Sequence, residues 1–106
     1  MKDRKHAGER GRRAEKIAAN YLSKQGYRII ERNFACKLGE IDIIARHEGD
    51  LVFVEVRSRH SASAVNPAYS VDRHKQRKIV RSAEVYLDKH FDRTPPSRFD
   101  VVLVTF

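Results

Sequence analysis

Residues Gly39 to Arg57 have the sequence GEIDIIARHEGDLVFVEVR, from which the arrangement of the central strands can be predicted. Residues 40–46 and 51–58 are rich in Ile, Val and Phe, a composition that predicts two β-strands. Between them, the tight sequence His47-Glu48-Gly49-Asp50 predicts a hairpin. Because side chains alternate between the two faces of a strand, the hairpin also fixes which residues of the two strands share a face.

Acidic residues interrupt both strands at positions otherwise built for burial. Asp42 lies among isoleucines, and Glu55 lies between valines, two residues before Arg57. If the hairpin turns on Glu48-Gly49, Asp42 lies directly opposite Glu55, with Cβ atoms roughly 5 Å apart. Two carboxylates so placed repel each other unless a positive group intervenes. A divalent cation such as Mg²⁺, which prefers oxygen ligands, would remove the repulsion.

A purely structural interpretation fits the same residues. Glu55 and Arg57 share one face of their strand and can form an ion pair, while Asp42 can be hydrated at a strand end. The residues alone support the structural interpretation and the metal site about equally, and the opposed carboxylates slightly favour the metal site.

The rest of the chain predicts two helices and two more strands. Gly11–Leu22 is expected to form an amphipathic helix that ends at Gly26, with a buried stripe of Ala14, Ile17, Ala18, Tyr21 and Leu22. Tyr27–Asn33 and Phe99–Phe106 predict strands. A second helix, from about Asp72 as its cap, is expected to bury Ile79, Ala83, Tyr86, Leu87 and His90.

The resulting order is αβββαβ. A meander followed by a helical connection predicts an α/β fold in which a mixed sheet is flanked by helices. The 106 residues leave room for one domain, residues 1–106, with one modest core. Residues 61–70 show no periodicity and predict a mobile loop suited to a lid or a substrate contact, with Tyr69 as a weak candidate.

The charge of the chain indicates a polyanionic partner. Lys and Arg number 22 against 14 Asp and Glu, a formal net charge of +8. Nucleic acid is the first candidate, and an anionic membrane is the competitor. No apolar run approaches the length of a bilayer span, and the single cysteine, Cys36, excludes a disulfide framework. We therefore expect a cytoplasmic protein without membrane association.

The two strands also resemble the signatures of a known family. Residues 39–45 and 52–57 are similar to the GEIDLIA and VFVEVR signatures of the YraN-like family, which is related to restriction-endonuclease-like PD-(D/E)xK nucleases and archaeal Holliday junction resolvases. The resemblance implies a restriction-endonuclease-like αβββαβ core. It implies metal-binding positions at Asp42 and Glu55, the motif's lysine position at Arg57 and a helix-borne acid at Glu15. Glu40 is implied either to bind the metal or to support the residues that bind it. Arg57 is permanently charged, so it cannot be a general base near neutral pH.

The implied function is a metal-dependent DNA endonuclease that uses Mg²⁺ or Mn²⁺ on structured or nonspecific DNA, such as branched junctions. Lys75 and Gln76 are implied to position the substrate. The basic runs of the sequence add four candidates for phosphate binding, Arg12, Arg13, Arg77 and Lys78. The alternative interpretation is that these side chains only form a solvated surface. Two alternatives remain open, a nucleic-acid-binding module that does not cleave and an assembly factor that forms a homodimer through an open sheet edge.

Overall fold

The described residues form two helices and four strands in the order that the sequence predicts. The computed structural model describes residues 3–59 and 73–106. Its elements are α1 (Asp3–Lys24), β1 (Arg28–Cys36), β2 (Gly39–His47), β3 (Asp50–Arg59), α2 (Arg73–His90) and β4 (Ser97–Thr105). The αβββαβ order is therefore confirmed. The predicted loop at 61–70, with Tyr69, and the predicted cap Asp72 lie outside the described residues.

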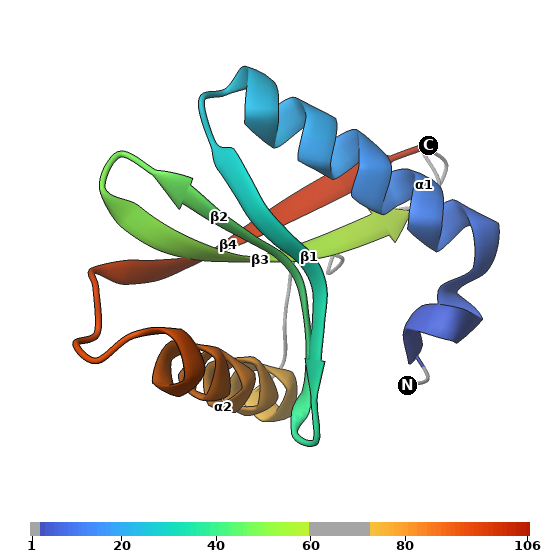
Figure 1. The fold of residues 1–106 in the computed structure, drawn as a ribbon. Coiled ribbons are helices and arrows are strands. Elements are labelled where there is room, and N and C mark those ends of the chain that lie inside the picture. Colours follow the sequence, from blue (N-terminus) through green and yellow to red (C-terminus); the bar gives the residue numbers. More distant parts are fainter. Residues whose placement is uncertain (1–2, 60–72) are drawn as a thin grey trace.

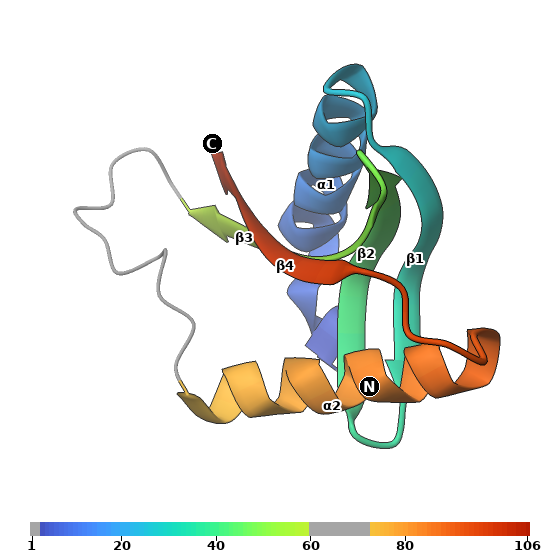
Figure 2. The same cartoon turned by 90° about the vertical axis from the view of Figure 1, so that its left-hand side faces the viewer.

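The strands form one mixed sheet in the order β1-β2-β3-β4. β1, β2 and β3 are antiparallel neighbours, and β4 lies parallel to β3. A parallel neighbour requires a crossover, and α2 lies within that connection. α1 covers one face of the sheet and α2 the opposite face (Figure 1). The predicted α/β fold, a mixed sheet flanked by helices, is confirmed, with β4 at one edge (Figure 2).

The β2–β3 hairpin turns on Glu48-Gly49, as predicted. Both residues have positive φ, 52° and 87°, which is the pattern of a type I′ turn. The turn sets a register in which Ala45 faces Val52 and Ile43 faces Val54. The paired register ends at Ile43 and Val54, one residue before Asp42 and Glu55, so the direct opposition of these two acids stays a prediction.

Helix α1 is longer than predicted, and its buried stripe is rotated from the predicted one. It begins at Asp3, with a kink at Gly8, and the buried positions are Ala14, Glu15, Ala18, Ala19 and Leu22. The prediction that Ile17 and Tyr21 are buried was wrong, because they are 43% and 53% exposed. The alanines let the helix lie close to the sheet. Tyr21 lies outside this contact and lines a hollow together with residues 99–102 of β4. Gly26, with φ +95°, ends the helix in a Schellman motif, in which the Tyr27 N–H donates to the Leu22 carbonyl.

Helix α2 buries Ser82, Ala83 and Tyr86. The prediction that His90 lies on the buried face was wrong, because this residue is exposed and its ring stacks on Tyr86 at 4.1 Å. Ile79 and Leu87 are half-buried. Ser82 is buried because the β1–β2 hairpin comes so close to the helix that only a small side chain fits there.

Each face of the sheet has its own apolar core. On the α1 side, Ile43, Ala45, Val52 and Val54 pack with the helix alanines and Leu22. On the α2 side, Ile44, Leu51 and Phe53 pack with Phe34, Ile41, Ala83 and Tyr86. The central strands β2 and β3 are thus buried on both faces, which explains their continuous apolar runs. Among the described residues, no helix has the length and apolar character that crossing a membrane requires.

Candidate functional site

The candidate site lies where β2 and β3 separate. Their antiparallel pairing ends at Ile43 and Val54, while β3 continues beside β4 as far as Arg59. At the point of separation, the Val56 N–H donates a 2.7 Å hydrogen bond to Oδ2 of Asp42. The Val56 N–H has no backbone partner on β2 at this point, because β3 no longer pairs with β2. The Asp42 carboxylate accepts its hydrogen bond instead, and this bond offsets the cost of burying an acid that is only 7% exposed.

A cavity of about 660 Å³ opens at this separation. Its walls come from α1, the β1–β2 hairpin, the second half of β3 and the first turns of α2. Both acidic and basic side chains line it: Glu15, Glu40, Asp42, Glu55, Lys37, Arg57, Lys75 and Lys78. The cavity therefore gathers all four of the predicted metal-ligand residues, from α1, β2 and β3.

Glu55 lies between two cations. Its Oε2 is 3.9 Å from Nζ of Lys75 and 4.0 Å from Nη1 of Arg57. The Glu55 side chain is 15% exposed, whereas those of Arg57 and Lys75 are 29% and 50% exposed. Both distances exceed ordinary hydrogen-bond lengths, so these are charge contacts rather than charge-assisted hydrogen bonds. The Glu55–Arg57 pair that the structural interpretation invokes thus forms, but only loosely.

Glu15 is held in the same cavity from the α1 side. Its side chain is buried, and Oε1 accepts a 3.0 Å hydrogen bond from Nδ2 of Asn33. Nη2 of Arg32 lies 3.8 Å from the same oxygen. Asn33 has φ +59°, a backbone conformation that asparagine tolerates better than most residues. The sequence ended the first strand at Asn33 and gave no sign that this residue supports Glu15.

The carboxylates line one cavity without forming a closed cage. Glu40 is half-buried at the start of β2 and contributes the fourth acid. Within residues 3–59 and 73–106, however, no three His, Cys, Asp or Glu side chains are grouped to hold a metal ion by themselves. Carboxylate oxygens suit Mg²⁺, which is commonly bound by one or two carboxylates with waters and substrate phosphate. The donor set fits such an open site.

The predicted nucleic-acid-binding residues of α2 differ in their positions. Lys75 and Lys78 line the cavity, whereas Arg77 borders a separate hollow with Arg73 and Arg81. Gln76 borders that hollow and also lines a smaller pocket together with Glu55. All of these α2 residues are exposed. Their arrangement makes α2 basic on the cavity side and on the outer side.

The predicted residues of α1 lie beside the cavity rather than in it. The cavity is lined by their neighbour Gly11. Arg12 is exposed and pairs with Glu9 at 3.6 Å, while the guanidinium of Arg13 lies 4.9 Å from the ring centroid of Phe106. Arg12 thus has an acidic partner and Arg13 an aromatic one, and their predicted contact with phosphate stays a prediction.

Comparison with known proteins identifies the family. The model of the uncharacterised protein family UPF0102 matches residues 14–104. The chain belongs to this family. A UPF0102 protein of Caldanaerobacter subterraneus subsp. tengcongensis is 53% identical over 91 residues, which cover 85% of this chain and 74% of the relative. A UPF0102 protein of Hahella chejuensis is 47% identical over 93 residues, covering 88% and 75% of the two chains. One of Pelobacter propionicus is 44% identical over 104 residues, covering 96% and 72%.

The family membership confirms the YraN-like resemblance. The UPF0102 names carry no activity, so the nuclease function and the roles of the site residues stay predictions. In this UPF0102 chain the matched residues extend from Ala14, beside Glu15, to Val104 in β4, so they span every wall of the cavity.

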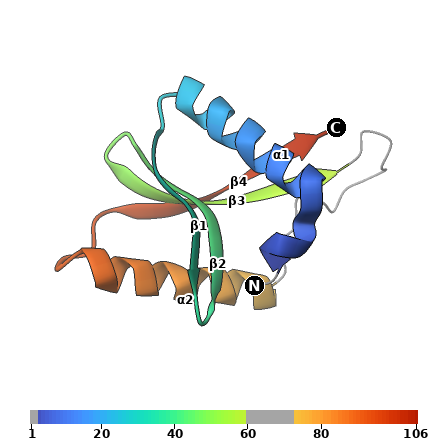
Figure 3. The same cartoon turned by 45° about the vertical axis from the view of Figure 1, so that its right-hand side comes forward.

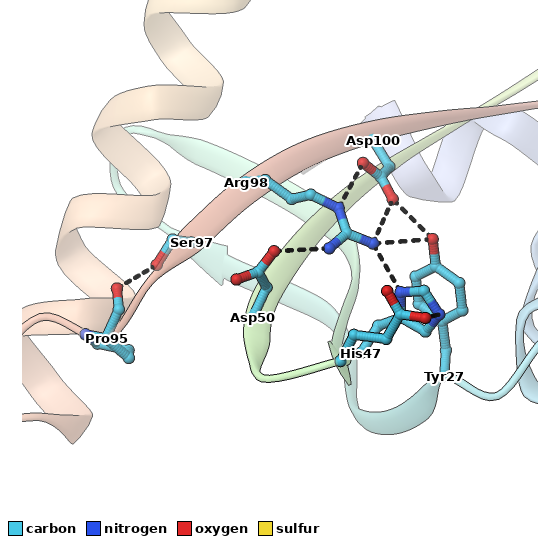
Figure 4. A network of polar contacts seen from close by, with 8 residues as sticks. Tyr27, His47, Asp50, Pro95, Ser97, Arg98 and Asp100 are labelled. Carbon is cyan, nitrogen blue, oxygen red and sulfur yellow. Dashed lines mark hydrogen bonds and ion pairs between the residues drawn. The ribbon is translucent and has the colours of Figure 1, made fainter.

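A second polar cluster lies at the other end of β3 (Figure 4). Nη1 of Arg98 donates to Asp50 at 2.8 Å, Nε donates to Asp100 at 3.2 Å, and Nη2 donates to the Tyr27 hydroxyl at 3.1 Å. The hydrogen bond to Asp50 is the main cause of a raised pKa for Arg98. Burial, followed by the hydrogen bond to Asp100, raises the pKa of Tyr27. This cluster joins β4 to the β2–β3 turn and to the segment after α1, so we assign it a structural role.

Sequence reasoning missed several residues of the cavity. Lys37 and Leu38, in the turn between β1 and β2, line it together with Cys36 and Ser58. Lys37 is the nearest basic residue before the GEID sequence, and that position was the only available sign of its role. Leu38 carried no sign, because apolar turn residues are usually without function.

Proposed function

We propose that this chain is a metal-dependent DNA endonuclease that hydrolyses phosphodiester bonds in structured or nonspecific DNA. One observation carries the proposal. Four carboxylates from α1, β2 and β3 line a single cavity whose other charged side chains are basic. Phosphodiester hydrolysis needs this combination, because carboxylates bind the cation that activates water while basic groups bind the anionic backbone.

The cation would be Mg²⁺ or Mn²⁺, held by Asp42 and Glu55, while Glu15 and Glu40 line the same cavity and would be further oxygen ligands or bind its waters. When bound, it lowers the pKa of a coordinated water and neutralises charge on the phosphate. Asp42 is fixed for this task because its Oδ2 is anchored to the Val56 N–H. Preorganised acids lose little freedom on binding a cation, which favours affinity.

The cationic residues would bind the phosphate rather than move protons. Arg57 keeps its charge at all physiological pH values, so its role is to stabilise negative charge in the transition state. Lys75 supplies an ammonium from α2 to the same carboxylate that Arg57 contacts. A lysine thus reaches the site from a second element, although arginine occupies the lysine position of the strand motif. Lys37 and Lys78 extend the basic wall outward for flanking phosphates.

The test is cleavage of fluorescent branched and linear DNA with Mg²⁺, with Mn²⁺ and with EDTA. Asp42→Asn should abolish metal-dependent cleavage, while the amide oxygen can still accept the Val56 N–H, so the fold is kept. Glu48→Gln is the matched control, because this acid is 81% exposed in the β2–β3 turn, outside the cavity. Equal cleavage by Asp42→Asn and the parent would contradict the proposal.

The second candidate is a nucleic-acid-binding module that does not cleave. It is favoured by the contacts of Glu55, whose charge is already balanced by Lys75 and Arg57. DNA binding by the parent without cleavage under any metal condition would support this function instead. An assembly role as a homodimer draws support from β4, an edge strand on which Phe99 and Val101 are 48% and 46% exposed. A cytoplasmic location belongs to the same proposal and rests on composition.

A further inference from the structure

The tip of the β1–β2 hairpin presents an apolar side chain at the rim of the cavity. Lys37 and Leu38 form the turn, and Cys36 pairs with Gly39 at its base. Leu38 is 42% exposed and lines the cavity. In three views the tip projects past α2 (Figures 1, 2 and 3). Two-residue hairpin turns ordinarily carry Asn, Asp or Gly, so Lys-Leu is an unusual choice for a turn in water.

The tip is held firmly against α2. A Cβ atom on Gly39 would lie only 3.1 Å from Oγ of Ser82, so glycine permits a closer approach than any other residue. Ser82 is fully buried, and its Oγ accepts a 3.7 Å hydrogen bond from Sγ of Cys36. Leu38 is therefore an exposed side chain on a braced support, unlike a leucine on a freely moving loop.

Basic side chains share the lining of the cavity with Leu38, beside the four acids. Lys37 is its neighbour in the turn, and Lys75 and Lys78 line the same cavity from α2. Such a rim attracts the phosphates of a nucleic acid and brings the bases next to the tip. Apolar side chains that reach bases in this way are known to insert between base steps and unstack them. The lysines can bind the phosphates on either side of a base step while the leucine contacts the bases of that step.

We propose that Leu38 is a wedge that inserts at a weakened base step, so that the cavity selects DNA at a branch, flap or nick over continuous duplex. The proposal rests on the proposed function in taking DNA as the ligand of the cavity. Leu38 precedes Asp42 by four residues, so along an extended strand their Cα atoms are separated by at most roughly 13 Å. At about 3.4 Å per nucleotide, cleavage should fall within about four nucleotides of the unstacked step.

The test uses a three-way DNA junction with 2-aminopurine at the branch, since the fluorescence of this base rises when it unstacks. Measured in EDTA, where metal-dependent cleavage cannot occur, the parent should raise the fluorescence severalfold on the junction and little on a linear duplex. Leu38→Ala should lose most of this increase while it binds linear duplex within about twofold of the parent. Leu38→Met, which keeps an apolar side chain, should restore the increase.

Ile30→Ala is the matched control, because Ile30 is also 42% exposed and lies in β1, the strand that leads into the turn, but far from the turn itself. It should leave the fluorescence increase unchanged. An increase that survives in Leu38→Ala, or that is lost equally in Ile30→Ala, would overturn the wedge, as would DNA binding by the parent with no increase. A parent that unstacks the junction but never cleaves with metal supports the wedge and refutes only the cleavage.

Discussion

The substitution Glu55→Gln separates a metal ligand from a structural ion pair. If Glu55 chiefly holds a cation, the amide keeps the shape of the side chain but removes the charge that binds metal. The protein without metal should then be about as stable as the parent, while metal binding and cleavage are lost. If Glu55 is instead a structural partner of Arg57 and Lys75, the same change leaves two cations uncompensated and should destabilise the fold.

The contacts of Glu55 give the size of each effect. Its two cations lie 3.9 and 4.0 Å away, and Lys75 is half exposed, so solvent screens the interaction. Loose ion pairs that solvent screens contribute about 0–1 kcal/mol. We therefore expect a change below about 1 kcal/mol, or less than about 4 °C in Tm. A well-packed buried pair would instead cost about 3–5 kcal/mol, a fall of more than about 10 °C.

The assay is thermal unfolding of the parent and the variant with and without Mg²⁺. At a metal concentration ten times Kd, binding stabilises the parent by about 1.4 kcal/mol, or roughly 6 °C in Tm, and Glu55→Gln should lose that shift. Glu48→Gln, in the exposed turn, should keep it. The reasoning is refuted if Glu55→Gln melts more than about 10 °C below the parent in EDTA while the parent itself shows no metal-induced shift.

Three further predictions test the phosphate wall, the hairpin contact and the Arg98 cluster. Lys78→Ala should reduce the slope of log K against log salt by about 0.9 for duplex DNA, and an unchanged slope would mean that this side chain is merely solvated. Gly39→Ala should destabilise the fold by about 1–3 kcal/mol in urea melts, because φ is +154° and the new Cβ would lie 3.1 Å from Oγ of Ser82; full stability would contradict the close packing. The pKa of Tyr27 is raised above its ordinary value of 10.0. The contribution of the protonated phenol to folding stability is therefore complete below pH 10 and is lost as the pH rises through the pKa of the folded state. In urea melts between pH 9 and 11, the free energy of unfolding should thus fall more steeply with pH for the parent than for Tyr27→Phe. Equal pH dependence in the two proteins would contradict this assignment.

The sequence was sufficient for the features that depend on local chemistry. The Glu48-Gly49 turn could be recognised from its residues, and the turn determines the register of β2 and β3 from His47–Asp50 to Ile43–Val54. Strand boundaries followed from composition to within a few residues. The first strand was the largest error, because Asn33 marks an irregular position inside β1 and not its end.

Features that depend on tertiary partners could not be predicted. The inward position of Glu15 depends on Asn33, 18 residues away, so a helical periodicity based on apolar residues alone turned the stripe of α1 toward Ile17 and Tyr21. The bonds of Arg98 to Asp50 and Tyr27 span 48 and 71 residues. No short-range pattern carries information at such separations, because the contacts arise only after β4 has docked beside β3.

The charge balance of the cavity is compatible with both candidate functions, DNA cleavage and nucleic-acid binding without cleavage. The lining contains four acids and four bases, so the site can fold without a cation, and Glu55 already has Lys75 and Arg57 beside it. A cation that binds Glu55 must compete with these two charges. Lys75 is half exposed on the first turn of α2 and can move aside toward a phosphate at little cost, whereas Arg57 is fixed on β3. Under the proposed function, we expect substrate phosphate to draw Lys75 away from Glu55, so that DNA binding strengthens metal binding.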